Sequence, residues 1–233
     1  MTYSSRRWAF RAGGPSSDEQ ASPATTHTGI EARPRLRPSS PTKSALRSAP
    51  VPFLHRTPRG TTANRALKRL HDSNQLTAEK LLRLSQSDLA ALIRSCGYHN
   101  QKARKLQLLA GQWAYASSLR RRPEAMRERL LTVWGIGPET ADSILLYAFG
   151  HPYFVVDAYA RRVFSRVGME EGGGSYETVQ QLVHQELGQE EGVLGELHAL
   201  LVSLGKSFCK TRPLCGGCTL QRVCQTGRKL DSR

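Results

Sequence analysis

LLTVWGIGPETADSILLYA, residues 130–148, decides the fold, because it joins two helical patterns through a short glycine turn. The first apolar run ends near Val133, and Gly135 and Gly137 permit a tight turn with positive φ. Pro138 suits the first position of a new helix, where its missing N–H costs nothing, and Glu139 in the first turn favours the positive helix end. The stretch therefore predicts a second helix that begins at Pro138.

A turn of this kind can bind phosphate. Backbone N–H groups of a glycine-rich loop, next to a helix N-terminus, converge on an anion. Such contacts anchor a nucleic-acid backbone without reading its sequence. We expect the DNA contacts to come from Gly135, Ile136, Gly137 and Thr140. The alternative is an ordinary corner between two helices, since a pair of glycines alone is a weak signal.

Apolar residues recur at helical spacing on both sides of this unit. They predict a helix capped by Ser87 and longer helices over about 100–117 and 158–167. The stripes include Leu89, Leu92 and Ile93 in the first helix, and Leu194, Leu197, Leu200, Leu201 and Leu204 in a last one. Only Tyr153–Val156 resembles a strand, and it is too short to pair into a sheet. The predicted fold class is therefore all-α.

The charge of the chain favours a polyanionic partner. Its 233 residues carry a formal net charge of +15. Such an excess of positive charge favours binding to a nucleic acid, because counterions are released from the phosphates. A solvated basic surface or a ribosome-associated protein is the alternative. No apolar run reaches the roughly 18 residues of a membrane span, and no signal segment follows the N-terminal arginines. We expect a monomer in the cytoplasm, associated with the nucleoid.

Residues 1–60 differ in composition from the rest. They hold eight of the twelve prolines, ten Lys and Arg against three Asp and Glu, and no regular periodicity. This composition predicts a disordered basic segment; an arm that follows DNA non-specifically is the functional alternative. The expected division is then a helical domain over 61–208, a cysteine loop over 209–224 and a tail over 225–233.

Four of the five cysteines fall within sixteen residues near the C-terminus: Cys209, Cys215, Cys218 and Cys224. A reducing cytosol argues against disulfides and for a metal. Four thiolates in a compact loop can hold a 4Fe-4S cluster or a tetrahedral Zn²⁺, and spacing alone barely separates the two. Cys96 stands apart in a helical region, which predicts a small core residue.

Asp157 follows three apolar residues and precedes the predicted helix 158–167. Its surroundings should be partly desolvated, and its position is that of an N-cap. From this local sequence alone, a capping role is the simpler interpretation.

The segment GIGPETADSILLYAFGHPYFVVDAYARRV, residues 135–163, resembles the helix-hairpin-helix and catalytic segment of endonuclease III and its relatives. The resemblance runs from about Ala63 to Cys224. It implies two helical lobes, double-stranded DNA with a damaged base in the groove between them, and cleavage of the N-glycosidic bond of a flipped base. Asp157 then matches the catalytic carboxylate, which would stabilise oxocarbenium character on the sugar.

The same resemblance bears on the cysteine loop. The spacing C-x5-C-x2-C-x5-C is one residue shorter in its first gap than the cluster motif of endonuclease III. The resemblance implies a 4Fe-4S cluster, with Zn²⁺ as the minor alternative. Basic residues beside the loop, Lys206 among them, would present positive charge to DNA phosphates.

Glu139 departs from the family pattern at a catalytic position. Bifunctional members carry a lysine there, whose amine forms a Schiff base with the sugar and nicks the strand. A carboxylate cannot do this, so the resemblance points to the monofunctional branch, which includes 3-methyladenine glycosylases. Water would be the nucleophile and an abasic site the product. A bifunctional glycosylase and AP lyase is the alternative if another lysine reaches the pocket.

The N-terminal side also departs from the family. Residues 61–70 resemble the family's segment just after its first, Gln-containing helix, whereas 50–59 contain three prolines and do not resemble that helix. The expectation is an absent helix, or a misassigned start of the chain. Two other functions stay open: a catalytically degenerate DNA-binding protein that keeps the hairpin and the cluster, and a zinc-ribbon-type nucleic-acid adaptor.

Overall fold

Helices account for all regular structure between residues 60 and 231, the part of the chain that this computed structural model describes. Within that part no strand occurs, which confirms the all-α class. The predicted disordered segment 1–60 lies outside the described residues, apart from Gly60. Among the described helices, none has both the length and the apolarity needed to cross a bilayer.

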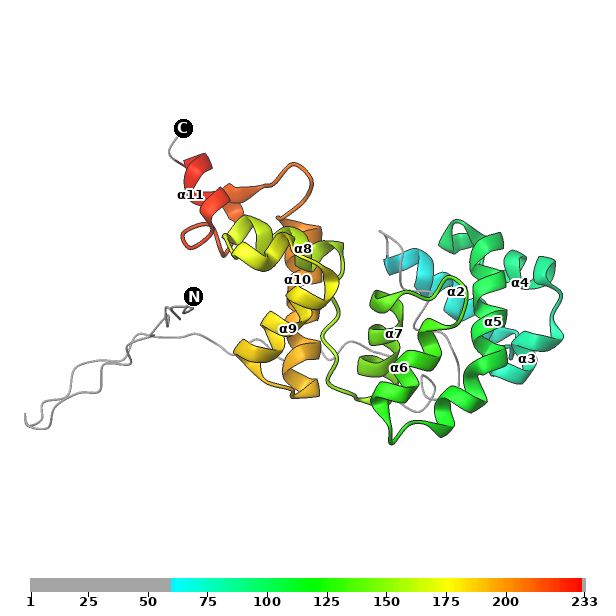
Figure 1. Cartoon of the computed structure of the whole chain (residues 1–233). Coiled ribbons are helices and arrows are strands. Elements are labelled where there is room, and N and C mark those ends of the chain that lie inside the picture. Colours follow the sequence, from blue (N-terminus) through cyan, green and yellow to red (C-terminus); the bar gives the residue numbers. More distant parts are fainter. Residues whose placement is uncertain (1–59, 232–233) are drawn as a thin grey trace, which may run out of the picture. The chain divides into compact units, whose positions relative to one another are not determined.

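The elements fall into two runs along the chain (Figure 1). The first run consists of α2 (Gly60–Asp72), α3 (Ala78–Arg83), α4 (Gln86–Leu92), η2 (Arg94–Cys96), α5 (His99–Ser118), α6 (Pro123–Leu131), α7 (Pro138–Ile144) and a π-helical turn η3 (Leu145–Phe149). An extended stretch leads to α8 (Ala158–Val167), η4 (Glu170–Gly173), α9 (Tyr176–Leu187), α10 (Glu191–Ser207), η5 (Cys215–Gly217) and α11 (Gln225–Asp231). The predicted helices over 100–117 and 158–167 are thereby confirmed as α5 and α8.

Polar caps set where several helices begin. Thr77, Ser85, Asp157 and Ser175 each accept a hydrogen bond from the backbone amide three residues further on. The predicted cap Ser87 is wrong, because it lies inside α4. Ser85 has the extended backbone that a cap needs, and its hydroxyl meets that of Ser87 at 2.8 Å.

Buried apolar side chains form three clusters, one among α2–α5, one among α5–α7 and one among α8–α10. Cys96 is 3% exposed in the first cluster, so its predicted core role is confirmed. The expected core position of Leu200 is wrong, because that side chain is 58% exposed. It lies about 100° around the helix from Leu201, which places it outside the buried stripe.

Side chains of α9 hold the extended stretch that precedes α8. Gln180 Nε2 donates to the Phe154 carbonyl at 2.7 Å, and the Phe154 amide donates to His184 Nε2 at 3.1 Å. The Val156 amide points at the Tyr176 hydroxyl at 3.4 Å. The strand-like stretch of the sequence is therefore extended, but its backbone groups bond to side chains instead of a neighbouring strand.

Asp142 of α7 is fully buried and links three helices. Arg127 of α6 donates to both carboxylate oxygens, at 2.6 and 3.2 Å, and Gln180 of α9 donates to Oδ2 at 2.8 Å. The hydrogen bond to Asp142 is the main cause that raises the pKa of Arg127. A buried ion pair is tolerated when further hydrogen bonds satisfy its remaining lone pairs, as Gln180 does here.

Asp142→Asn should lower the free energy of unfolding by about 3 kcal/mol, because it leaves the Arg127 guanidinium without its buried counter-charge. The matched control is Asp72→Asn, whose carboxylate pairs with Lys68 at the exposed surface and should leave stability unchanged. Urea titration followed by circular dichroism measures both. Equal effects of the two substitutions would contradict the importance given to the buried network.

Candidate active site and nucleic-acid interface

The hairpin between α6 and α7 closes with one backbone bond, from the Ile136 amide to the Val133 carbonyl at 3.0 Å. Gly135 has φ +80°, which confirms the predicted positive φ at that position. The same prediction is wrong for Gly137, whose φ of −100° and ψ of 179° are extended backbone open to any residue. A Cβ at Gly137 would meet nothing within 4 Å, so this residue is open to an approaching partner.

Two of the expected DNA-binding residues point inward. The side chains of Ile136 and Thr140 are each 5% exposed, and the Thr140 amide donates to the Gly137 carbonyl. Ile136 packs in the second apolar cluster and so fastens the hairpin to the core. The surface of the hairpin is therefore made by the half-exposed Trp134 side chain and by the backbone at Gly135 and Gly137.

Cationic side chains of α5 lie beside the hairpin. Arg104 Cζ stands 4.5 Å and Lys105 Nζ 5.7 Å from the centroid of the Trp134 ring, which is a cation–π arrangement. The stem of Lys105 fills the space that a Cβ on Gly135 would need. Sequence reasoning missed this pairing, although the basic run at 102–105 offered a signal for it.

Asp157 is the N-cap of α8, as its position in the sequence predicts. Its Oδ1 accepts from the Ala160 amide at 2.8 Å, and its side chain is 14% exposed. Burial by itself raises the pKa of this carboxyl, but the facing His198 imidazole and the amides of Ala160 and Tyr159 together lower it. The group is thus a partly desolvated carboxylate that stays ionised.

His198 of α10 faces that carboxylate. Its Nε2 lies 3.6 Å from Asp157 Oδ2, an ion-pair distance too long for a hydrogen bond, and its Nδ1 lies 2.5 Å from the Tyr147 hydroxyl. Tyr147 belongs to η3, the turn that continues α7. The side chains of Tyr147 and His198 therefore connect the segment that follows the hairpin to Asp157.

Glu139 and Lys206, the other predicted site residues, belong to other parts of the chain than Asp157. Glu139 is half-buried in the first turn of α7, where its carbonyl accepts from the Ser143 hydroxyl at 2.6 Å. Lys206 is exposed in the last turn of α10, three residues before the first loop cysteine. Their predicted roles stay predictions.

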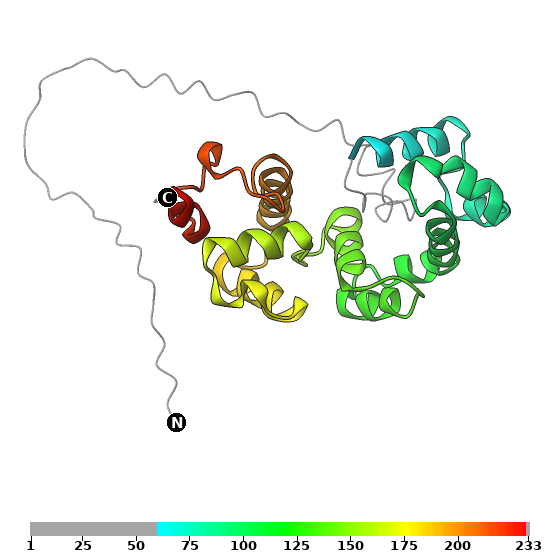
Figure 2. The ribbon, with the colours of Figure 1, turned by 90° about the horizontal axis from the view of Figure 1, so that it is seen from above.

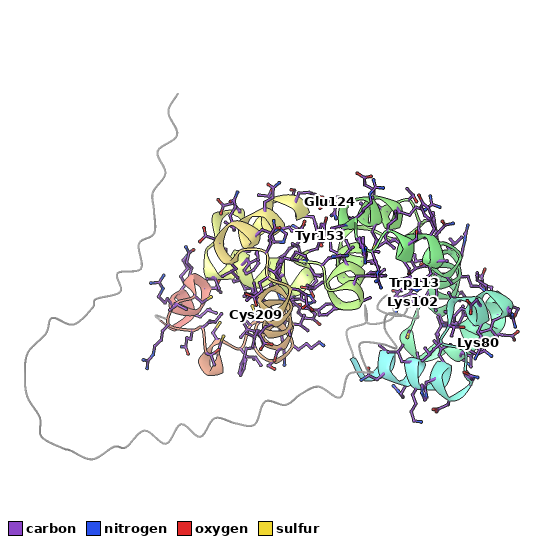
Figure 3. All side chains as sticks on the ribbon, turned by 90° about the horizontal axis from the view of Figure 1, so that it is seen from below. Lys80, Lys102, Trp113, Glu124, Tyr153 and Cys209 are labelled. Carbon is purple, nitrogen blue, oxygen red and sulfur yellow. The ribbon has the colours of Figure 1, made fainter. Side chains whose placement is uncertain are left out.

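The four loop cysteines line one cavity beside α8, of about 370 Å³ including space open to solvent. Figure 3 labels Cys209, which follows α10, and Figure 2 shows the loop running on toward α11. Partial burial and the nearby sulfurs of Cys224, Cys218 and Cys209 raise the pKa of the Cys215 thiol. Between residues 60 and 231, no three His, Cys, Asp or Glu side chains are grouped as a site for one metal ion.

Two arginines of α8 bind the start of this loop. Arg162 Nε donates to the Cys209 carbonyl at 2.6 Å. Arg166 donates to the carbonyls of Lys210 and Thr211 at 2.5 and 2.8 Å, and one of its N–H groups faces the Cys209 sulfur at 3.4 Å. The helix that begins at Asp157 therefore also positions the cysteine loop.

Comparison with known proteins identifies the class. Residues 59–189 match the model of the HhH-GPD superfamily base excision DNA repair proteins. A candidate DNA repair glycosylase of Methanocaldococcus jannaschii is 34% identical over 69% of this chain and 76% of its own length. Endonuclease III of Rickettsia felis is 32% identical over 70% and 75% of the two chains.

Solved structures agree with these relatives. An endonuclease III trapped as a covalent intermediate with DNA, in an estranged-adenine complex, superposes with a TM-score of 0.66 and 25% identity, over 78% of this chain and 84% of that one. The 3-methyladenine DNA glycosylase MagIII of H. pylori, bound to 1,N6-ethenoadenine, has a TM-score of 0.53 and 26% identity, over 66% and 71%. The chain belongs to the HhH-GPD superfamily and is a base-excision DNA repair glycosylase of the endonuclease III family.

Proposed function

We propose that this glycosylase is monofunctional, and that Asp157 is its catalytic carboxylate. The observation that carries the proposal is the state of Asp157: one oxygen is fixed by the Ala160 amide, the side chain is mostly buried, and its pKa is lowered. Such an anion stabilises the positive charge that develops on the sugar as the glycosidic bond breaks. The base leaves with the bonding electron pair, water adds to C1′ and loses a proton, and an abasic site remains.

Glu139 supports hydrolysis over lyase chemistry. A relative of the endonuclease III type has been trapped as a covalent intermediate with DNA. The lysine amine that the family resemblance places at this position is replaced here by a carboxylate, which forms no Schiff base. The product is therefore an intact strand with an abasic site, as expected for the branch that includes 3-methyladenine glycosylases.

The partner is duplex DNA with a damaged base, which the hairpin anchors by its backbone. Gly135 and Gly137 bring the main chain to the surface, and the N-terminus of α7 adds a favourable field for a phosphate. Arg104 and Lys105 place two cations next to the same turn. Their charge offsets the repulsion between a phosphate-rich strand and Asp157.

The cysteine loop fits a 4Fe-4S cluster. Four cysteines line one cavity, and the sulfurs of Cys224, Cys218 and Cys209 help to raise the pKa of the Cys215 thiol, so a cationic iron core would relieve the repulsion between thiolates there. Cys209, Cys215, Cys218 and Cys224 are the ligands in this proposal. A bound cluster would stabilise the loop and could exchange an electron; it takes no part in the hydrolysis.

Purified protein should release the base from at least one duplex in a panel that carries 3-methyladenine, 1,N6-ethenoadenine or mispaired thymine. Asp157→Asn should slow release at least a hundredfold, on the order of the loss for a removed electrostatic group in an active site. The strand should break only after alkali, and borohydride should trap no covalent adduct. Tight binding to an abasic analogue without any turnover would instead support a non-catalytic DNA-binding protein.

Gly137→Val should weaken binding to duplexes of any sequence with only a small loss of stability. A Cβ at this position meets no protein atom within 4 Å, so the fold should persist although valine is a poorer N-cap than glycine, and the side chain would occupy the place where a phosphate approaches the backbone. Fluorescence anisotropy with two unrelated duplexes and a thermal melt measure both effects. Unchanged affinity would remove the hairpin from the DNA interface.

Protein purified without oxygen should be brown, absorb at about 400 nm and contain about four iron atoms per chain. Cys218→Ser should lose the colour, whereas Cys96→Ala, which changes a cysteine in the first apolar cluster, should keep it. A colourless protein with one zinc atom would identify the minor alternative.

A further inference from the structure

Asp157, His198 and Tyr147 form a chain of three polar groups from three different elements. Nδ1 of His198 meets the Tyr147 hydroxyl at 2.5 Å, while its Nε2 faces Asp157 Oδ2 at 3.6 Å. That Nε2 atom is buried and has no hydrogen-bond partner. A buried ring nitrogen aimed at a carboxylate, a fraction of an ångström beyond hydrogen-bond distance, calls for an explanation.

The tautomer of the imidazole follows from the carboxylate that it faces. A carboxylate accepts only, so the ring faces it favourably with Nε2–H. In the neutral tautomer that carries this hydrogen, Nδ1 accepts from the Tyr147 hydroxyl. Burial, followed by the negative charges of Asp157 and Glu191, raises the pKa of Tyr147, which keeps the phenol protonated for this purpose.

The surrounding elements give the imidazole few competing partners. Arg161 and Arg162 of α8 donate to the carbonyls of Gly174 and Cys209. On the α9 side, His184 and Tyr176 face backbone amides of the extended stretch, and the Phe154 ring stands edge-on to His198. Glu191 lies in the first turn of α10, and its negative charge helps to raise the pKa of Tyr147.

The backbone at Tyr147 is unusual as well. Residues Leu145–Phe149 form a π-helical turn, which changes the direction of side chains relative to a regular α-helix and is frequent at functional sites. Tyr147 lies at its centre and contacts a residue 51 positions further along the chain. The turn thus gives the phenol a partner on α10.

We propose that His198 is a positioning residue for the catalytic carboxylate: its Nε2–H holds Asp157 Oδ2, and Tyr147 fixes the required tautomer from the opposite ring nitrogen. This inference rests on the role proposed above for Asp157. With the Ala160 amide on one oxygen and His198 on the other, the carboxylate keeps one orientation toward the sugar. The 3.6 Å distance closes to a hydrogen bond when DNA binds, as catalytic hydrogen bonds often tighten in the complex.

The test compares two substitutions, each of which replaces only one of the two ring nitrogens with an amide nitrogen. His198→Gln places an amide N–H near the position of Nε2 and preserves the donor to Asp157; His198→Asn reaches only the Nδ1 side and loses that donor. Single-turnover base release from the panel duplex that wild type cleaves fastest is measured against pH. We expect His198→Asn to be on the order of tenfold slower, a usual loss for a group that orients a functional ligand.

The pH profile separates positioning from mere structure. His198 lowers the pKa of Asp157, so its removal should raise that pKa and let the carboxyl take up a proton at higher pH. The acid limb of the rate should therefore move toward neutral pH in His198→Asn and stay close to wild type in His198→Gln. Tyr147→Phe should reduce the rate less than His198→Asn does. The matched controls, His71→Gln and Tyr115→Phe at exposed positions, should change neither rate nor limb.

Each outcome has a distinct meaning. A wild type that releases no base from the panel defeats the proposed function itself. The positioning role alone is overturned if wild type is active and His198→Asn has the same acid limb. This holds whether the rate of the variant is unchanged or is lowered equally at every pH. Affinity for a duplex with a tetrahydrofuran abasic analogue should fall less in His198→Asn than the rate of base release does, because the hydrogen bond acts on the carboxylate and not directly on the DNA.

Discussion

The buried carboxylate of Asp142 is the constraint on which the rest of the molecule depends. Its charge is balanced by Arg127 from α6, and its second oxygen fixes Gln180 from α9. Gln180 in turn holds the carbonyl of Phe154, three residues before Asp157. An interaction deep in the protein thus ties the hairpin helices to the stretch that ends at Asp157, the carboxylate proposed to be catalytic, because a buried charge tolerates no loss of a partner.

Much of this could be predicted from the sequence, because local rules determine it. Pro138 begins α7 and Asp157 caps α8 since each residue type suits its position whatever its distant neighbours are. The bounds of α8 follow from the cap and from the apolar repeat behind it. Cys96 is in the core, as a lone cysteine in an amphipathic stretch should be. The spacing of the loop cysteines and the resemblance of the hairpin supplied the class of protein.

The rest could not be predicted, because it depends on residues far apart in the chain. Asp142 reads as an ordinary polar position on α7, and only the fold brings Gln180 to it. Tyr147 and His198 are separated by 51 residues, and the π-helical turn that pairs them leaves no pattern in the sequence. Gly137 is another case: the sequence suggests a requirement for positive φ, whereas the backbone there is extended and no protein atom lies within 4 Å of where a Cβ would be.

A crystal structure of the wild-type protein with a duplex that contains a tetrahydrofuran abasic analogue tests the central claim most directly. We predict the Asp157 carboxylate about 3.5 Å from the position of C1′, with His198 Nε2 at hydrogen-bond distance behind it and a phosphate on the backbone of Gly135 and Gly137. A complex in which the sugar binds elsewhere, or in which Asp157 remains only a helix cap remote from DNA, would contradict the account.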